Sequence, residues 1–237
     1  MKNSSKSIKP NTKTSLITYI ILIVAFVVVQ IMLATGSMSY MMQDLLVPLC
    51  VYAILAVSLN LTVGILGELS LGQAGFMCIG AYSGALFSNL METAIPEAIV
   101  RFPIALLLGG VCAAIFGILI GIPVLRLRGD YLAIVTLAFG EIIKNICASI
   151  YLGKDANGFQ TSLKSVSDMN MANDGEMLIN GALGINGTPH DSNFVIAFII
   201  LFVTVIISYN FVNSRTGRAV MSIRDNKIAA ESIGINI

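Results

Sequence analysis

The apolar residues of this chain are gathered into six long stretches, separated by shorter polar segments. Each stretch is close to the ~20 residues with which a helix crosses the ~30 Å hydrocarbon layer of a membrane. Inside that layer the backbone must satisfy its own hydrogen bonds, which favours helices. The pattern therefore predicts an all-α polytopic integral membrane protein with about six transmembrane helices, at residues 15–34, 45–64, 70–91, 102–124, 131–151 and 193–212.

Composition supports the membrane prediction and argues against several other classes. Hydrophobic residues make up 56% of the chain and charged residues 11%, whereas a soluble domain carries about 25% charged residues. The net charge of +1 gives no electrostatic basis for nucleic-acid binding. The four cysteines stand singly in apolar stretches and His190 is the single histidine, so neither a metal site nor a cofactor is expected.

The distribution of lysine and arginine predicts which ends of the helices face the cytoplasm, because cytoplasmic segments carry an excess of these residues. With a cytoplasmic N-terminus, six crossings return the C-terminus to the same side and leave only Arg101, Lys154 and Lys164 outside. The first apolar run is longer than a signal-peptide core, so we expect it to remain as a span. Ten basic residues are then cytoplasmic: Lys2, Lys6, Lys9, Lys13, Arg126, Arg128, Arg215, Arg218, Arg224 and Lys227.

Residues 152–192 form the one long segment between predicted spans, and the charge rule places it outside. The segment is rich in Gly, Asn, Asp and Ser and carries five acidic residues against two basic ones, so we expect it to have some structure of its own. Within the spans, small residues recur four positions apart, a spacing that lets helices approach closely in lipid. They are Gly80 and Gly84, and Ala113, Gly117 and Gly121.

A first group of polar residues surrounds a break between the second and third predicted spans. Ser70 and Gln73 have the spacing of a capping box, which predicts that a helix restarts at Ser70. Asn60, Glu68 and Gln73 are then polar groups close to a helix break near the membrane edge, and polar groups around broken helices often line transport pathways. The alternative is a tight cytoplasmic turn whose polar residues meet water. The break is marked by Gly64 and Gly67.

A second group lies within the fifth predicted span. Asp130 precedes the apolar run and is predicted to cap the helix. Glu141 and Lys144 share a helix face at i, i+3, with Asn145 beside them, well inside the span. Ionisable groups at that depth cost a few kcal/mol each, so they are expected to pair or to face a wet cavity. Two interpretations remain: an ion pair that packs the bundle, or a direct role in a transport pathway.

The final segment, 213–237, reads as a water-facing amphipathic helix. Lys227 and Glu231 are placed to form an i, i+4 ion pair. A short amphipathic helix after a span can lie on the membrane surface or fit a groove on a partner, and the small, Ala-rich apolar side favours a protein groove. That side is formed by Ala219, Ile223, Ala230 and Ile233.

Taken together, these segments resemble the LivM-type permease of branched-chain amino acid ABC importers, from about Leu45 to the final residue. The resemblance near the break lies in Leu59-Asn60-Leu61, Gly64, Gly67, Ser70-Leu71-Gly72, Phe76 and Ile79-Gly80-Ala81-Tyr82. In the fifth span it lies in Leu125-Arg126-Leu127-Arg128-Gly129, Tyr131-Leu132-Ala133-Ile134, Thr136-Leu137 and Gly140-Glu141-Ile142-Ile143-Lys144. In the last segment it lies in Ser214, Gly217-Arg218-Ala219, Ile223-Arg224, Ala229-Ala230 and Gly234-Ile235.

The resemblance implies a binding-protein-dependent importer in a bacterial inner membrane. Two permease subunits would form the pathway for an amino acid, two cytosolic ATPases would drive it, and an external binding protein would deliver the cargo. The chain has no P-loop, so it is expected to be a transport subunit and not an enzyme. The implied ATPase-coupling residues are Arg218, Ala229, Ala230 and Gly234, and the pathway candidates are Asn60, Gln73, Glu141 and Lys144.

The sequence departs from the family pattern at several positions. Ile228 stands where the general coupling pattern has a Glu, and Glu68 and Gln73 stand where the family often has Gln and His. Family members continue into further spans after the coupling segment, so 1–237 is expected to be a single membrane permease domain that is truncated or incomplete. Three other functions stay open: a related permease for urea or short amides, an ion-coupled secondary transporter that titrates Glu141, and a membrane scaffold.

Overall fold

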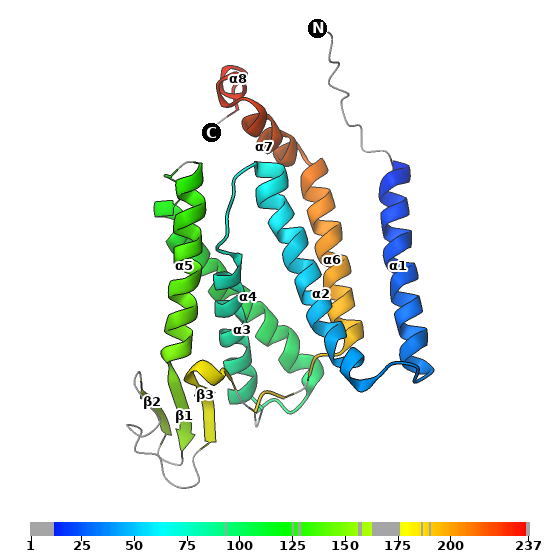
Figure 1. Cartoon of the computed structure of the whole chain (residues 1–237), viewed down its shortest axis with the longest axis vertical. Coiled ribbons are helices and arrows are strands. Elements are labelled where there is room, and N and C mark those ends of the chain that lie inside the picture. Colours follow the sequence, from blue (N-terminus) through cyan, green and yellow to red (C-terminus); the bar gives the residue numbers. More distant parts are fainter. Residues whose placement is uncertain are drawn as a thin grey trace. The chain divides into compact units, whose positions relative to one another are not determined.

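The computed structural model describes residues 12–92, 94–124, 126–127, 129–155, 158–162, 176–185, 187–189 and 191–235. Six long helices and two short ones follow one another in these residues (Figure 1). Their bounds are α1 Thr12–Ala34, α2 Tyr40–Asn60, α3 Gln73–Leu90, α4 Ala98–Val124, α5 Asp130–Ser149, α6 Phe194–Asn213, α7 Arg215–Asp225 and α8 Lys227–Ser232. The strands are β1 Tyr151–Asp155, β2 Gly158–Ser162 and β3 Glu176–Asn180, and short helices η1 Leu61–Leu66 and η3 Gly181–Leu183 complete the order.

Helices α1 to α6 correspond to the six predicted spans, and the prediction of a polytopic helical membrane protein is confirmed. Among the described residues, five helices are long and apolar enough to cross a membrane, and α3 is not one of them. It begins at Gln73 instead of residue 70 and has 18 residues, among them Gly, Ser and Asn. Such residues lower the apolar character of a helix but allow close packing against a neighbour.

The chain forms two compact units, one of Met1–Gly67 with Ser192–Ile237 and one of Glu68–Asp191. In the first unit α2 packs along α6 and continues without a break into η1, a π-helical turn. Helix α1 meets α6 through aromatic rings: the ring centroids of Phe26 and Phe198 lie 4.7 Å apart. Tyr19 makes an edge contact with Phe202 at 5.8 Å.

In the second unit α3 lies across α4 with their backbones in close contact. A Cβ added to Gly109 would stand 2.6 Å from the carbonyl oxygen of Gly80, and one on Gly84 would stand 3.1 Å from that of Ala105. The predicted close approach at Gly80 and Gly84 is therefore confirmed. A Cβ on Gly121 would meet nothing within 4 Å, so the predicted small-residue ladder on α4 is used only in part.

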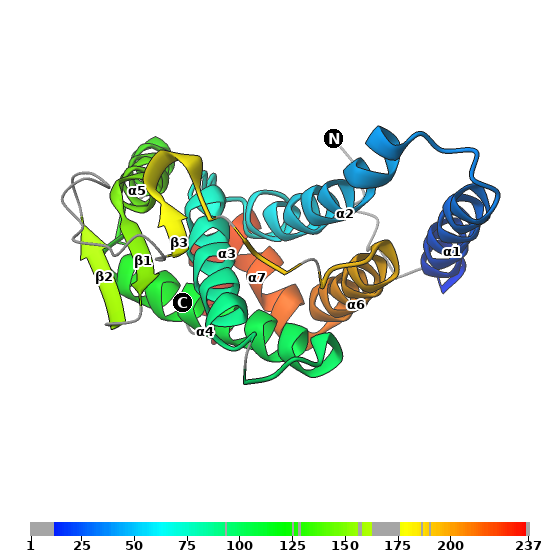
Figure 2. The same cartoon turned by 90° about the horizontal axis from the view of Figure 1, so that it is seen from below.

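A small antiparallel sheet follows α5, with the strand order β2-β1-β3 (Figure 2). Leu152 of β1 pairs with Thr161 of β2 and with Ile179 of β3, and the side chain of Ile179 is fully buried. Helix η3, which follows β3, packs against α5. The expectation that segment 152–192 has structure of its own is confirmed. Lys164 and His190 lie outside the described residues.

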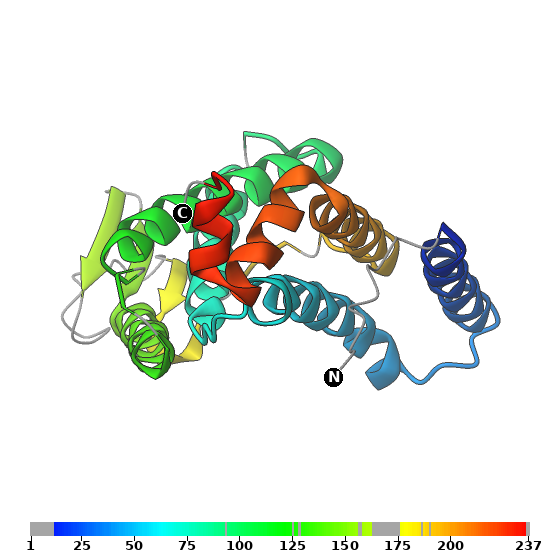
Figure 3. The same cartoon turned by 90° about the horizontal axis from the view of Figure 1, so that it is seen from above.

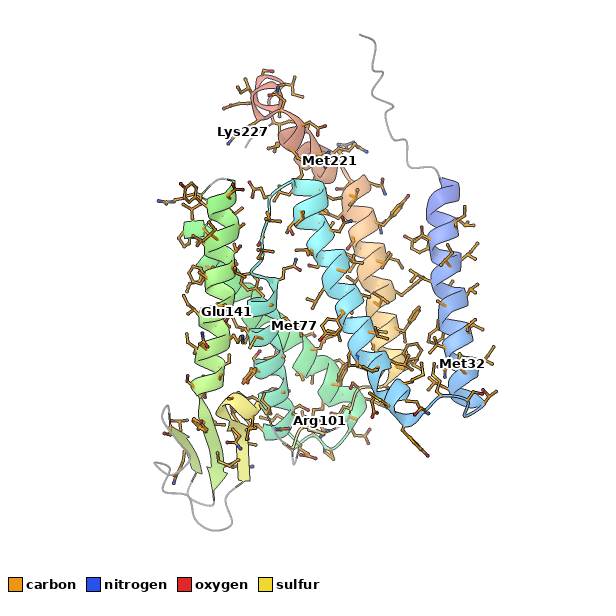
Figure 4. The ribbon with its side chains drawn as sticks, viewed as in Figure 1. Met32, Met77, Arg101, Glu141, Met221 and Lys227 are labelled. Atoms are coloured by element: carbon orange, nitrogen blue, oxygen red, sulfur yellow. The ribbon has the colours of Figure 1, made fainter. Side chains whose placement is uncertain are left out.

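An ion pair holds the end of this unit to the beginning of α4. The Nη2 of Arg101 lies 2.7 Å from the Oδ2 of Asp191, and Arg101 is only 3% exposed. Its Nη1 also donates a hydrogen bond to the carbonyl oxygen of Ile95 at 3.2 Å. Figure 4 labels Arg101 near the first turn of α4. Because the guanidinium has several acceptors, its burial is compensated.

Candidate functional site

The chain between α2 and α3 is extended, not a tight turn. Gly67 adopts a left-handed conformation with φ of 79°, and residues 67–71 have no helical structure before Gly72, the N-cap position of α3. No side-chain cap forms there, so the predicted capping box of Ser70 and Gln73 is wrong. The physical reason is a distant hydrogen bond: the amide of Leu71 donates to the Thr136 hydroxyl of α5 at 3.0 Å, which holds this segment extended.

This extended segment runs along α5, and α3 begins beside the middle of that helix. Cβ atoms added to Gly72 and Gly75 would lie 3.1 Å from the Thr136 carbonyl oxygen and 3.0 Å from the Cα of Gly140. At 1.5 Å per residue, Thr136 lies ~9 Å and Gly140 ~15 Å from the start of α5. Non-helical backbone at membrane depth is found where it is buried in protein or lines a water-filled cavity.

Of the two pathway residues predicted near this break, only Gln73 lies next to it. Asn60 is the last residue of α2 and is exposed, but the helix continues through η1 to Leu66. Its carboxamide lies over Gly64, where any Cβ would collide with it. Gln73 is the first residue of α3 and is half-buried. Gln73 therefore begins the helix after the non-helical segment, whereas Asn60 lies within a continuous helix.

Glu141 and Lys144 form the predicted i, i+3 pair on α5, with 3.4 Å between Oε2 and Nζ. The pair is not buried in the bundle: the side chains are 57% and 70% exposed, and Asn145 beside them is exposed as well. Figure 4 shows Glu141 on α5. Neither side chain is buried among the described residues, and the choice between a packing role and a pathway role stays a prediction. An ionisable side chain in the centre of a span costs about 2.5–3.5 kcal/mol on insertion scales, which disfavours contact with lipid.

Asp130 is not the N-cap of α5. Gly129 takes that position with φ of 61°, and Asp130 is the first residue inside the helix, without a side-chain capping bond. Its carboxylate still lies in the first turn, where the helix dipole favours a negative charge. Arg126 is exposed just before this turn, and Arg128 lies outside the described side chains.

The final segment forms two short helices, α7 and α8, instead of the single predicted helix (Figure 3). The Ser214 hydroxyl accepts a hydrogen bond from the amide of Gly217 and caps α7, whereas Asn226 caps α8 by accepting from the amide of Ala229 at 3.1 Å. Such polar residues end one helix and begin another because their side chains replace missing backbone partners. Ile233, predicted on the apolar side, is exposed.

The four predicted coupling residues differ in their surroundings. Arg218 is exposed and donates to the carbonyl oxygen of Asn213 at 3.1 Å, and Ala229 is exposed on α8. Gly234 follows α8 in a left-handed conformation with φ of 87°. Ala230 is only 2% exposed, unlike Arg218 and Ala229.

An apolar surface on α8 was missed by the sequence analysis. Ile228 and Ile233 are 81% and 74% exposed there. The signal in the sequence was the Ile at position 228, which was noted only as a departure from an acidic pattern. The predicted ion pair between Lys227 and Glu231 does not form among the described residues.

Thr136 was also missed as a site residue. Its hydroxyl is buried, donates to the carbonyl oxygen of Ala133 at 3.0 Å and accepts from the amide of Leu71. A threonine within an apolar run is ordinary in a membrane helix, so only the structure identifies its distant partner. Thr136, which binds the extended segment before α3, and the exposed Glu141–Lys144 pair therefore lie on the same helix, α5.

The chain has apolar helices of membrane length, an extended segment that leads into α3 beside the middle of α5, and a charged pair part-way along α5. These features define a polytopic membrane protein of the permease class. The family described as "branched-chain amino acid transport system / permease component" matches residues 41–237. The chain belongs to this family. Helix α1 precedes the matched region.

Two curated relatives carry the name "high-affinity branched-chain amino acid transport system permease protein LivM", one from Escherichia coli (strain K12) and one from Salmonella typhimurium (strain LT2). Each is 32% identical over 195 residues, which cover 78% of this chain and 44% of the relative. The match therefore spans less than half the length of these relatives. No solved structure matches the chain.

Proposed function

We propose that the chain is the membrane-spanning part of a permease subunit in an ATP-driven, binding-protein-dependent importer of branched-chain amino acids. Membership of the permease family and the names of the two relatives support this cargo. The structural observation that carries the proposal is the exposed Glu141–Lys144 pair on α5. The same helix binds the extended segment before α3 through Thr136. A charged pair that is exposed among the described residues suits a wet pathway better than lipid.

The proposed orientation places both termini in the cytoplasm of a bacterial inner membrane and the β1–β3 sheet outside. The excess of lysine and arginine in the N-terminal segment, the α4–α5 connection and α7–α8 supports it. In this orientation the sheet meets the external binding protein, and α7 and α8 meet the ATPase. The exposed Ile228 and Ile233 of α8 provide an apolar contact for that partner.

The pathway is proposed to run between two permease subunits, along the face of α5 that carries Glu141 and Lys144. Asn60, the last residue of α2, and Gln73, the first residue of α3, are proposed to contribute further polar groups. Transport then follows alternating access: closure of the two ATPases on ATP moves α7 and α8, and the spans reopen on the other side. The cargo does not need to contact the ATPases, because the movement of α7 and α8 carries the free energy of ATP binding to the spans.

Uptake of labelled leucine in cells with and without this chain tests the proposal. Uptake that requires the chain, stops on ATP depletion and survives a proton ionophore supports the importer. Uptake that is lost with the ionophore alone supports an ion-coupled transporter that uses Glu141. Uptake of leucine that is independent of the chain, with labelled urea uptake that depends on it, contradicts the amino acid assignment and supports the short-amide permease.

A further inference from the structure

Arg224, near the end of α7, is hydrogen-bonded to η1 in the same unit. Its Nη1 donates a hydrogen bond to the carbonyl oxygen of Gly64 at 2.7 Å, although the two residues are 160 positions apart. Helix α7 also packs directly against η1. Among the described residues, this guanidinium also contacts the adjacent Asp225 at 3.1 Å, and that exposed ion pair is a weak interaction.

The carbonyl of Gly64 is an acceptor because it lies at a helix end. The continuous helix formed by α2 and η1 ends at Leu66, and the last carbonyl groups of a helix have no partner within it. The amide of Gly67 satisfies the carbonyl of Thr62, and Arg224 satisfies that of Gly64. A cation at this position also interacts favourably with the negative end of the helix dipole. Arg224 therefore caps α2 and η1 from another helix.

Gly67 has two physical reasons to be a glycine. Its φ of 79° lies in the left-handed region, where a side chain is unfavourable. In addition, a Cβ there would stand 2.6 Å from the Cγ and 2.8 Å from the Cδ of Arg224. The side chain of the arginine thus passes through the space that a side chain at position 67 would need. Any substitution of Gly67 must displace Arg224.

The hydrogen bond between Arg224 and Gly64 lies next to the proposed pathway residue Asn60. Gly64, which accepts from Arg224, also carries the carboxamide of Asn60 over its Cα. One residue of η1 therefore contacts the arginine of α7 on one side and the polar end of α2 on the other. A displacement of α7 must move the Gly64 carbonyl or break a charge-assisted hydrogen bond.

We propose that Arg224 is the positioning residue that transmits movement of α7 and α8 to α2 and η1. This inference rests on the proposed function, because it assumes that α7 and α8 receive the movement of an ATPase. The inference adds a specific contact to the proposed function, the hydrogen bond between Arg224 and Gly64. Gly67 leaves the space that the Arg224 side chain occupies.

The test uses the complete transporter with its own ATPases and binding protein in phospholipid vesicles, and measures leucine imported and ATP hydrolysed in the same sample. Loss of one charge-assisted hydrogen bond changes an equilibrium constant by about tenfold. Arg224→Met is therefore expected to lower leucine imported per ATP by about tenfold, with unchanged permease level and basal hydrolysis. Arg224→Lys, which keeps the charge and one donor, is expected to be intermediate.

Gly67→Ala supplies the independent variant, because it displaces Arg224 without changing it. We expect it to uncouple import to the same degree, and the double variant with Arg224→Met to be no worse than either single one. Gly36→Ala is the matched control for backbone strain: its φ is 65° and a Cβ there would meet nothing within 4 Å. Arg215→Met is the control for charge, because Arg215 lies on α7 without a hydrogen bond or ion pair to the described chain.

Three results overturn the inference: import per ATP at the wild-type level in Arg224→Met, a loss of permease from the membrane that explains all of the defect, or additive effects in the double variant. Failure of the proposed cargo is a separate outcome. If the unsubstituted transporter imports no leucine, stimulation of ATP hydrolysis by the binding protein replaces import as the readout. The same variants then decide whether Arg224 and Gly67 act together.

Discussion

Arg101 and Asp191 face each other as two planar forks. The Nη2 of the arginine lies 2.8 Å from Oδ1 and 2.7 Å from Oδ2 of the carboxylate, and its Nε lies 3.0 Å from Oδ2. The residues are 90 positions apart in the chain, yet their side chains are only 4% and 10% exposed. The pair fixes the segment that precedes α6 against the first turn of α4.

Removal of one partner from this pair is expected to destabilise the permease strongly. Asp191→Leu leaves a buried guanidinium with only the Ile95 carbonyl as an acceptor, and such losses cost about 3–5 kcal/mol. The double variant Arg101→Met with Asp191→Leu is expected to recover much of that loss, because no charge remains buried. Thermal unfolding of the purified permease in detergent measures both. A double variant that is as unstable as the sum of the single ones contradicts the prediction.

Two adjacent glycines of α4 are expected to respond in opposite ways to alanine. A Cβ on Gly109 would stand 2.6 Å from the Gly80 carbonyl oxygen, whereas one on Gly110 would meet nothing within 4 Å. Gly109→Ala should therefore separate α3 from α4 and destabilise the protein by roughly 1–3 kcal/mol. Gly110→Ala should be neutral or stabilising by up to about 1 kcal/mol, because alanine favours a helix. Equal unfolding temperatures for the two variants would contradict the predicted close contact between α3 and α4 at Gly109.

Sequence patterns located the long helices well. The span predicted at 102–124 is α4 at Ala98–Val124, and the one predicted at 193–212 is α6 at Phe194–Asn213. Long apolar runs carry this signal because a membrane selects for length and polarity. The start of α3 was misplaced because Ser70 and Gln73 have a capping spacing, and only the bond from Leu71 to Thr136 overrides it.

Sequence spacing predicted one of the two local ion pairs, Glu141–Lys144, but not Lys227–Glu231, and it did not predict which side chains are exposed. Helical geometry alone brings Glu141 and Lys144 together, so their pairing could be predicted. Which neighbours cover that face depends on the packing of distant segments, and the pattern along α5 does not contain it. The same limit applies to Ala230, whose burial depends on how α8 folds back against α7.

Substitution of Thr136 is expected to release the extended segment before α3. Thr136→Val keeps the shape of the side chain but removes the acceptor of the Leu71 amide, and a lost hydrogen bond is worth about 1 kcal/mol. Hydrogen exchange at Leu71 should become roughly five- to tenfold faster. Thr204→Val is the control, because that hydroxyl donates to the Ile200 carbonyl of its own helix. Unchanged exchange at Leu71 in Thr136→Val would refute the tether.

Exchange of the two charges on α5 separates a pathway role from simple pairing. Glu141→Gln and Lys144→Gln are each expected to lower leucine uptake severalfold, and the swapped variant Glu141→Lys with Lys144→Glu should not restore it. A pathway needs each charge at its own position, whereas an ion pair survives the exchange. Glu97→Gln, an exposed carboxylate just before α4, is the control. Full uptake in the swapped variant would mean that the charges only pair.

The Asn226 cap is expected to stabilise the junction between α7 and α8. Asn226→Ala removes the hydrogen bond to the amide of Ala229 and should cost about 1 kcal/mol of helix stability. Limited proteolysis is expected to cleave this junction faster, while Asn226→Asp keeps the cap. Asn193→Ala provides the matched control, because Asn193 is the N-cap residue of α6 without a side-chain capping bond. Equal cleavage rates for the two alanine variants would show that the cap is dispensable.

The exposed ion pair on α5 also has a consequence for assembly under the proposed function. If α5 spans the membrane as proposed, a copy of the chain alone would present Glu141 and Lys144 to lipid, at a cost of up to about 2.5–3.5 kcal/mol for each charge on insertion scales. A second protein surface or water over the pair would lower that cost. The two side chains would then favour the assembled permease over single copies in the bilayer.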